Sequence, residues 1–160
     1  MPLAIEQFTD PTLTSGDIFQ GVPDLVGPFR RFDPRRARTL VVNRPESVGG
    51  GTETVTGAFF FDPAAFRAVP TGNPAKARNG NLGRNLFDGP GINQWDLTLI
   101  KRVKLADTRH FELRADISNL FNHALFYPPI TTVDDASLMF GQVTQAAPGR
   151  VIQFSLRYGF

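Results

Sequence analysis

The sequence predicts an all-β fold of antiparallel strands joined by long irregular loops, and three observations support this. Three segments near the C-terminus alternate between apolar and polar residues, the pattern of a strand with one apolar face. The 15 glycines and 13 prolines leave little room for long helices. No run of about 18 apolar residues occurs, so we expect no membrane-spanning helix.

The middle segment, residues 110–121, shows the clearest alternation. Its apolar positions are Phe111, Leu113, Ala115 and Ile117, and its polar positions are His110, Glu112, Arg114, Asp116 and Ser118. A helix would scatter these charges around its circumference, so we predict a strand.

The flanking segments, residues 94–105 and 150–160, are predicted to be strands of the same kind. In the first, Trp95, Leu97, Leu99, Val103 and Leu105 alternate with Gln94, Asp96, Thr98, Arg102 and Lys104. Ile100 and Lys101 interrupt the pattern, so Lys101 is expected either to extend its amine to lipid headgroups or to lie at a bulge. In the last, Ile152, Phe154, Leu156, Tyr158 and Phe160 alternate with Gln153, Ser155, Arg157 and Gly159.

The lengths of these segments and of their connections favour a transmembrane β-barrel. Segments of about 9–12 residues suit a tilted strand that crosses a bilayer. A short turn joins the first two strands, whereas about thirty residues (119–151) separate the last two. Barrels have short periplasmic turns and long extracellular loops. We therefore expect residues 92–160 to form the last three strands, and residues 1–91 to form an irregular, mostly extracellular region with short strands.

This topology predicts which face of the strands contacts lipid and which face lines the lumen. The residues expected to face lipid are Trp95, Leu97, Leu99, Phe111, Leu113, Ala115, Ile117, Ile152, Phe154, Leu156 and Tyr158. Those expected to face the lumen are Asp96, Glu112, Arg114, Asp116, Gln153 and Arg157. Alternation alone fits a soluble sheet with one wet face equally well, and a soluble ligand- or carbohydrate-binding module remains the alternative.

Several motifs resemble those of a known family. The chain ends in Phe154, Leu156, Tyr158 and Phe160, which resembles the C-terminal signal read by the barrel-assembly machinery. The segment 117–123, Ile-Ser-Asn-Leu-Phe-Asn-His, looks like a late strand of TonB-dependent receptors. The approach to these strands (80–85, 89–91 and 95–101) and the upstream segments 23–27 and 60–66 are also similar to that family.

Together these motifs resemble the Oar-like branch of the TonB-dependent receptors, whose members often carry a carboxypeptidase-regulatory-like domain. The resemblance covers roughly residues 12–160. It implies a barrel of about 22 strands with an N-terminal plug, energy-coupled solute uptake through TonB, and a location in the outer membrane of a Gram-negative-type bacterium. Because no signal peptide, plug or TonB box is recognisable, we expect a segment of a longer reading frame that assembles with the remaining barrel and plug.

No constellation of residues predicts catalysis, so we expect neither an enzyme nor a cofactor. The two histidines, His110 and His123, lack the spacing of a zinc site, and Asp134-Asp135 is interpreted as a solvated pair. Five arginines lie in residues 30–38 together with Phe29 and Phe32. This cluster suits phosphate binding, but the net charge of +2 does not argue for nucleic acid, and we expect no nucleic-acid partner.

Overall fold

A computed structural model describes residues 2–7, 21–44, 49–70, 78–83, 85–133 and 137–160. Its strands are antiparallel, apart from one isolated bridge, Glu6 to Thr132, which is parallel. The predicted all-β class is therefore confirmed. The chain forms two compact units: unit 1 is Met1–Pro90 with Tyr127–Gln145, and unit 2 is Gly91–Phe126 with Ala146–Phe160.

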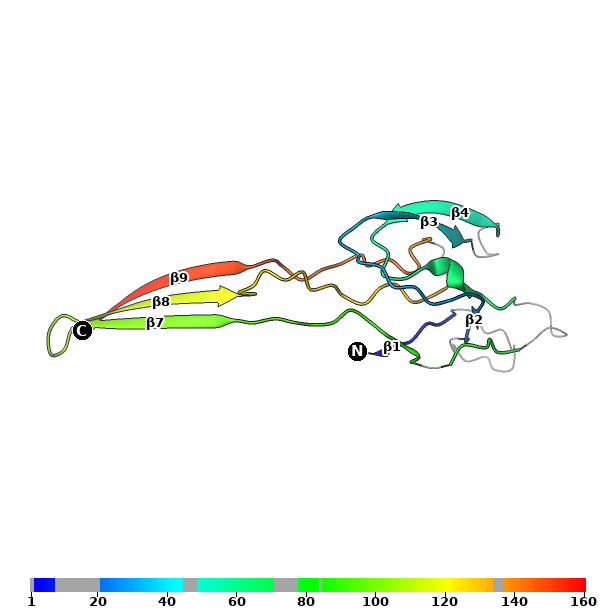
Figure 1. The fold of residues 1–160 in the computed structure, drawn as a ribbon. Helices are drawn as coiled ribbons and strands as arrows, with labels where there is room; N and C mark the ends of the chain where they lie inside the picture. The colour runs from blue at the N-terminus through cyan, green and yellow to red at the C-terminus, as the bar shows by residue number, and fades with distance from the viewer. Residues whose placement is uncertain (1, 8–20, 45–48, 71–77, 84, 134–136) are drawn as a thin grey trace. The chain divides into compact units, whose positions relative to one another are not determined.

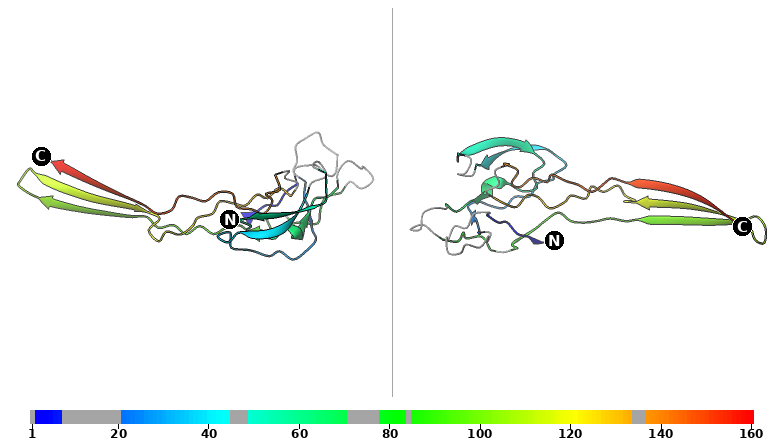
Figure 2. Two further views of the ribbon diagram at one scale, coloured as in Figure 1. Left: turned by 90° about the horizontal axis from the view of Figure 1, so that it is seen from above. Right: turned by 180° about the vertical axis from the view of Figure 1, so that it is seen from behind.

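Unit 2 is a three-stranded antiparallel sheet. Its strands are β7 (Leu97–Lys104), β8 (His110–Ser118) and β9 (Val151–Gly159), in the order β7-β8-β9. The three strands run side by side as a single layer (Figures 1 and 2). Each lies inside the range expected from the alternation, 94–105, 110–121 and 150–160. Among the described residues, β7 and β9 pair with β8 only, so each has one open edge.

The β7–β8 connection is the short turn that the sequence predicts. The Leu105 amide donates to the Arg109 carbonyl at 2.9 Å, and the Arg109 amide donates to the Ala106 carbonyl at 3.3 Å. The longer connection from β8 to β9 leaves unit 2 and passes through unit 1 as residues 127–145.

The described residues of unit 1 form short strand pairs and a 3₁₀ turn. Its elements are β1 (Pro2–Leu3), β2 (Asp24–Leu25), β3 (Arg38–Asn43), β4 (Thr52–Gly57), the 3₁₀ helix Pro63–Ala65, β5 (Phe66–Arg67) and β6 (Phe87–Asp88). The antiparallel pairs are β1–β6, β2–β5 and β3–β4. Among these described elements, only β3 and β4 are longer than two residues, and they form the hairpin labelled in Figure 1.

An aromatic cluster forms the core of unit 1. Phe61 and Phe66 are fully buried, and their rings meet edge to face with centroids 5.4 Å apart. Phe140 packs edge to face on both, at 5.2 and 5.7 Å. Burying one such side chain contributes roughly 2–3 kcal/mol, and edge-to-face pairs add to this. Unit 1 therefore has a hydrophobic core of its own despite its short strands.

Residues 127–145 supply part of this core, which the division of the sequence into residues 1–91 and 92–160 does not anticipate. Phe140 lies among the buried phenylalanines, and the Phe60 amide donates to the Gly141 carbonyl at 2.8 Å. Phe59 also forms an isolated bridge with Gln142. The β8–β9 connection is thus held by unit 1 through both packing and backbone hydrogen bonds.

Candidate membrane interface

The register of unit 2 brings the alternating apolar residues into continuous rows on one face. From one end of the sheet to the other, the rows are Leu97–Ile117–Ile152, Leu99–Ala115–Phe154, Lys101–Leu113–Leu156 and Val103–Phe111–Tyr158. Cross-strand neighbours of this kind lie about 5 Å apart, so the rows form one apolar surface across all three strands.

This apolar face is exposed. Phe154 and Leu156 expose 71% and 69% of their surface, and Leu113 on the central strand exposes 52%. Soluble proteins seldom present so continuous an apolar surface to water. The soluble-module alternative requires a second layer over these side chains, and no second layer is present within unit 2.

Lys101 lies within the apolar rows, and the structure decides between the two expectations for it. The β7–β8 register is continuous from Leu97 to Lys104, with Lys101 opposite Leu113. The bulge expected as one explanation is therefore absent from this strand pair. Ile100 correspondingly lies on the polar face, opposite Arg114.

The opposite face carries interleaved charges. The Arg102 Nε donates to the Glu112 carboxylate at 2.6 Å, and Glu112 also lies opposite Arg157 in the register. On the same face Arg114 contacts Asp116 at 2.7 Å, and Asp116 lies opposite Gln153. Such a ladder of opposite charges suits a hydrated or plugged interior.

A polar turn closes β8 at one end of the sheet. Asn119 has φ of 54° and is 97% buried, with only 3% exposed. Its side chain accepts from the His123 amide at 3.0 Å and donates to the His123 carbonyl at 2.9 Å. Its backbone amide donates to Asp96 Oδ1 at 2.8 Å, just before β7.

The same turn also reaches β9. The Asn122 side chain accepts from the Arg150 amide at 3.0 Å, next to the first residue of β9. The motif 117–123 therefore ties the ends of all three strands together. Asp96, expected only to face the lumen, accepts hydrogen bonds from both Ser118 and Asn119. The alternating sequence pattern does not predict this capping role of Asp96, because the role depends on contacts between different strands.

Aromatic pairs lie at both ends of the apolar face. Trp95 and Phe121 meet edge to face at 6.3 Å, and both are exposed. At the other end, the ring of Tyr158 lies 5.0 Å from Phe111 and 6.1 Å from the terminal Phe160. β7, from Leu97 to Lys104, rises about 24 Å, or roughly 18 Å along the bilayer normal when tilted by about 40°. This approaches the height of the apolar band of a membrane barrel.

In unit 1, described residues of the separate motifs at 23–27 and 80–85 form one polar clamp together with Arg78. Arg78 donates to Asp24 Oδ1 at 2.8 Å, which also accepts from the Asn81 amide at 3.1 Å. The Asn81 side chain in turn accepts from the Leu25 amide at 2.7 Å. The Arg78 hydrogen bond lowers the pKa of the Asp24 carboxyl below its ordinary value.

Gly80 allows the two motifs to approach so closely. Its amide donates to the Val22 carbonyl at 2.8 Å. A Cβ at this position would overlap the backbone oxygens of Val22 and Pro23. Glycine is therefore required at position 80 because it has no Cβ, and not because of its conformational freedom.

The motif 60–66 packs on the same clamp. Asp62 caps the 3₁₀ helix by accepting from the Ala64 amide at 3.1 Å. The Ala65 carbonyl then accepts from Val26 at 2.8 Å and from Gly27 at 3.3 Å. Three motifs that are distant in the sequence thus form one structural cluster. Their mutual contacts explain why they occur together, and no ligand is needed for that explanation.

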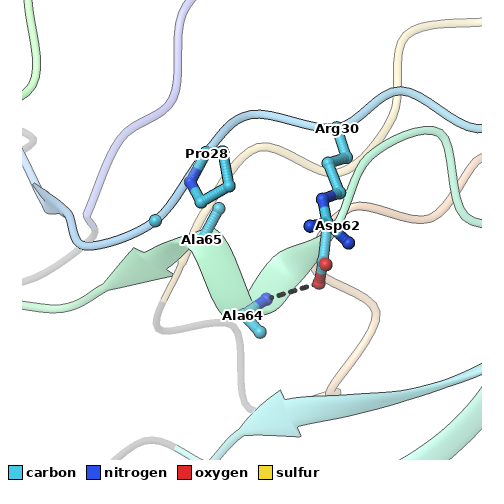
Figure 3. Close-up of a pocket in the computed structure, with 6 residues that line it drawn as sticks. Pro28, Arg30, Asp62, Ala64 and Ala65 are labelled. Carbon is cyan, nitrogen blue, oxygen red and sulfur yellow. Dashed lines mark hydrogen bonds between the residues drawn. The ribbon is translucent and has the colours of Figure 1, made fainter.

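A shallow cavity of about 240 Å³ lies beside this cluster, lined by Gly27, Pro28, Arg30, Asp62, Ala64 and Ala65. Figure 3 shows the Asp62 carboxylate hydrogen-bonded to the Ala64 amide. The Asp62 amide donates to the Arg30 carbonyl at 3.1 Å.

The described part of the chain has no group of three or more His, Cys, Asp or Glu side chains placed to hold a metal. His110 packs over Gly159, and the ring of His123 lies 6.1 Å from that of Phe121. Asp134 and Asp135 lie outside the described residues. None of the described helical segments is long and apolar enough to span a membrane.

Comparison with known protein families identifies the family of this chain. A family model described as an outer membrane beta barrel domain matches residues 5–153. The chain belongs to this family. The three-stranded sheet is thus a segment of an outer-membrane β-barrel, and the protein is located in the outer membrane. Searches of the curated proteins and of the solved structures found no match.

Proposed function

We propose that this outer-membrane barrel segment belongs to a TonB-dependent receptor of the Oar-like branch, which takes up solutes with energy relayed by TonB. The proposal is supported by one observation: the motifs that resemble this receptor family lie together in the structure. Segments 23–27, 60–66 and 80–85 converge through Asp24, Asn81 and Ala65, while segment 117–123 closes the sheet. Motifs that form common structural units are more specific than isolated matches.

In this proposal the apolar rows of unit 2 face lipid and the charged rows face the lumen. Leu99, Leu113 and Phe154 contact acyl chains, since they are exposed and lie between the two aromatic ends. Glu112 and Arg157 face the hydrated interior. The polar interior would contribute to the solute path or contact the plug, and no catalytic role is assigned to it.

The proposal also names the partners of this segment. β7 and β9 each have an unpaired edge among the described residues, and an unpaired edge in lipid is costly. Further strands of the barrel would pair there. Phe154, Leu156, Tyr158 and Phe160 form the signal proposed for the barrel-assembly machinery. TonB would act through the plug.

The proposal is tested on the complete reading frame that encodes this segment. We expect it to encode a plug and a TonB box, and a photo-crosslinker placed in that box should yield an adduct with TonB. Removal of the box should abolish the adduct while leaving the barrel in the outer membrane. A complete frame that encodes the barrel without a plug would contradict the receptor assignment, although not the family membership.

A further inference from the structure

The only Asn-Gly pair in the sequence, Asn79–Gly80, lies within the polar clamp of unit 1. Asparagine followed by glycine is prone to deamidation, because glycine has no side chain to obstruct attack of its backbone nitrogen on the asparagine amide. Asn79 is exposed, so water reaches its side chain. The proposed receptor function gives this pair no role.

Deamidation of this pair needs only water and a base from the solvent. The Gly80 amide loses its proton, and its nitrogen forms a bond to the side-chain carbonyl carbon of Asn79. The C–N bond of the side-chain amide breaks, ammonia leaves, and a succinimide ring remains. Water then opens the ring at either carbonyl, which leaves aspartate or isoaspartate at position 79. No electrons are transferred, so no oxidant or reductant is required.

The closed clamp holds the nitrogen that would react. The Gly80 amide donates to the Val22 carbonyl at 2.8 Å, and a Cβ at position 80 would overlap the backbone oxygens of Val22 and Pro23. A hydrogen-bonded amide exchanges its proton only after local opening, and loss of the same proton starts the deamidation. The packing that requires glycine at position 80 therefore also protects the Asn-Gly pair.

Contacts on both sides of Gly80 oppose this opening. The Asn81 amide donates to Asp24 Oδ1 at 3.1 Å. Arg78 donates to the same oxygen at 2.8 Å and to the Asn79 carbonyl at 3.1 Å. Hydrogen bonds to a carboxylate are stronger than those between neutral groups. Asp24 is therefore the side chain whose loss should free the Gly80 amide most effectively.

We propose that Asn79–Gly80 is a deamidation site that the closed clamp protects, and that isoaspartate at position 79 then prevents the clamp from closing. When opening and closing are fast, the rate of reaction follows the open fraction of the chain. Each contact that closes the clamp therefore slows deamidation. Because ammonia leaves, the reaction is a one-way record of clamp opening.

Isoaspartate would disrupt the clamp in two ways. The main chain then runs through the former side-chain carbons of Asn79, which adds a methylene before Gly80 and displaces its amide from Val22. The former Asn79 carbonyl, which accepts from Arg78 at 3.1 Å, becomes part of a carboxylate. This carboxylate competes with Asp24 for the Arg78 guanidinium.

The first test measures the rate of deamidation in the full chain, kept folded in detergent at mildly alkaline pH. Mass spectrometry follows the peptide that carries Asn79. The folded chain should react at least about tenfold more slowly than the urea-unfolded chain. Asp24→Asn should accelerate the reaction of the folded chain by about tenfold. The control Glu53→Gln removes a carboxylate that lies 3.6 Å from Arg44, and its rate should stay within about twofold of the wild type.

A second variant and a folding probe accompany this measurement. The Phe60 amide donates to the Gly141 carbonyl at 2.8 Å, so its exchange rate reports whether the aromatic core stays folded. Arg78→Gln removes the ion pair with Asp24 from its other side and should also accelerate deamidation. Acceleration with a protected Phe60 amide indicates opening of the clamp and not unfolding of unit 1.

The second test examines the effect of the product on the clamp. The Leu25 amide donates to the Asn81 side chain at 2.7 Å, so its exchange rate reports the closed clamp. After prolonged incubation, the isoaspartate-containing chain should exchange its Leu25 amide about tenfold faster than the fresh chain. Asn79→Gln, incubated in parallel, should keep its Leu25 protection because glutamine deamidates far more slowly.

Four outcomes would overturn the inference. Equal rates in the folded and unfolded chains would show that the clamp gives no protection. Unchanged rates in both Asp24→Asn and Arg78→Gln would show that these contacts do not control the reaction, and equal acceleration in Glu53→Gln would indicate a general response to charge. Unchanged exchange at Leu25 after incubation would show that the product leaves the clamp closed. None of these readouts depends on TonB, so failure of the receptor proposal remains distinguishable from failure of this one.

Discussion

At the scale of single residues, side-chain hydrogen bonds hold together segments that are far apart in the sequence. Asp24 receives hydrogen bonds from Arg78 and from the Asn81 amide. Gln7, which is fully buried, exchanges two hydrogen bonds with the backbone of Val69 at 2.8 and 2.9 Å. Buried or shared polar groups of this kind are costly to leave without a partner, so they determine which segments pack together.

The Asp24 clamp predicts that the stability of unit 1 depends on pH. The folded-state pKa of Asp24 is lowered, first by the hydrogen bond from Arg78. Its contribution is therefore complete above the ordinary value of 3.8 and is lost as the pH falls through the folded-state pKa. Amide exchange at Leu25 and Asn81 should accelerate over that range.

Matched variants isolate this contribution. Asp24→Asn should flatten the acid dependence of exchange at Leu25 and Asn81, because the titrating group is gone. Asp88→Asn should retain the wild-type pH dependence, because the Asp88 carboxylate is largely exposed and its distance of 3.8 Å to Arg31 is longer than a hydrogen bond. An unchanged pH profile in Asp24→Asn would show that another group controls the acid response.

At the scale of elements, the strands of unit 2 follow from local sequence, but their ends do not. Alternation predicts all three strands because period two is a property of neighbouring residues. The range expected for the middle strand, 110–121, extends too far, since β8 ends at Ser118 and Asn119 turns the backbone to φ of 54°. The contacts that stabilise this turn come from Asp96 and His123, which no local pattern indicates.

Asn119 provides a test of that turn. Asn119→Ala should destabilise unit 2 by roughly 2–3 kcal/mol, because it loses two side-chain hydrogen bonds and places alanine in the left-handed region. Asn119→Gly should cost less, roughly 1–2 kcal/mol. Glycine adopts the left-handed conformation without strain, so this variant loses only the side-chain hydrogen bonds. Urea unfolding of the full chain in detergent, followed by Trp95 fluorescence, measures both. Equal destabilisation by the two variants would show that left-handed backbone strain is unimportant.

At the scale of the whole molecule, the exposed apolar rows and the open sheet edges make the sheet dependent on its surroundings. Phe154 exposes 71% of its surface and Leu156 exposes 69%. A lipid phase removes this apolar area from water, and neighbouring barrel strands satisfy the edges.

The two faces of the sheet should therefore differ in how strongly an introduced arginine destabilises them. Leu113→Arg places a charge in the apolar rows and should cost about 2–4 kcal/mol near the middle of the bilayer. Gln153→Arg places the same charge on the polar face, opposite Asp116, and should have little effect. Recovery of the full chain in the outer-membrane fraction should fall several-fold in the first variant only. Similar recovery of both variants would contradict the assignment of the faces.

The sequence by itself determined the all-β class, the three C-terminal strands and their two faces, because each depends on residues that are close along the chain. Only the tertiary structure decided the rest. It brought residues 127–145 into the aromatic core of unit 1 through Phe140, kept Lys101 in the apolar rows and joined Asp24 to Asn81. These features depend on register and on contacts between distant segments, where packing and hydrogen-bond geometry select one arrangement among many that the same local patterns allow.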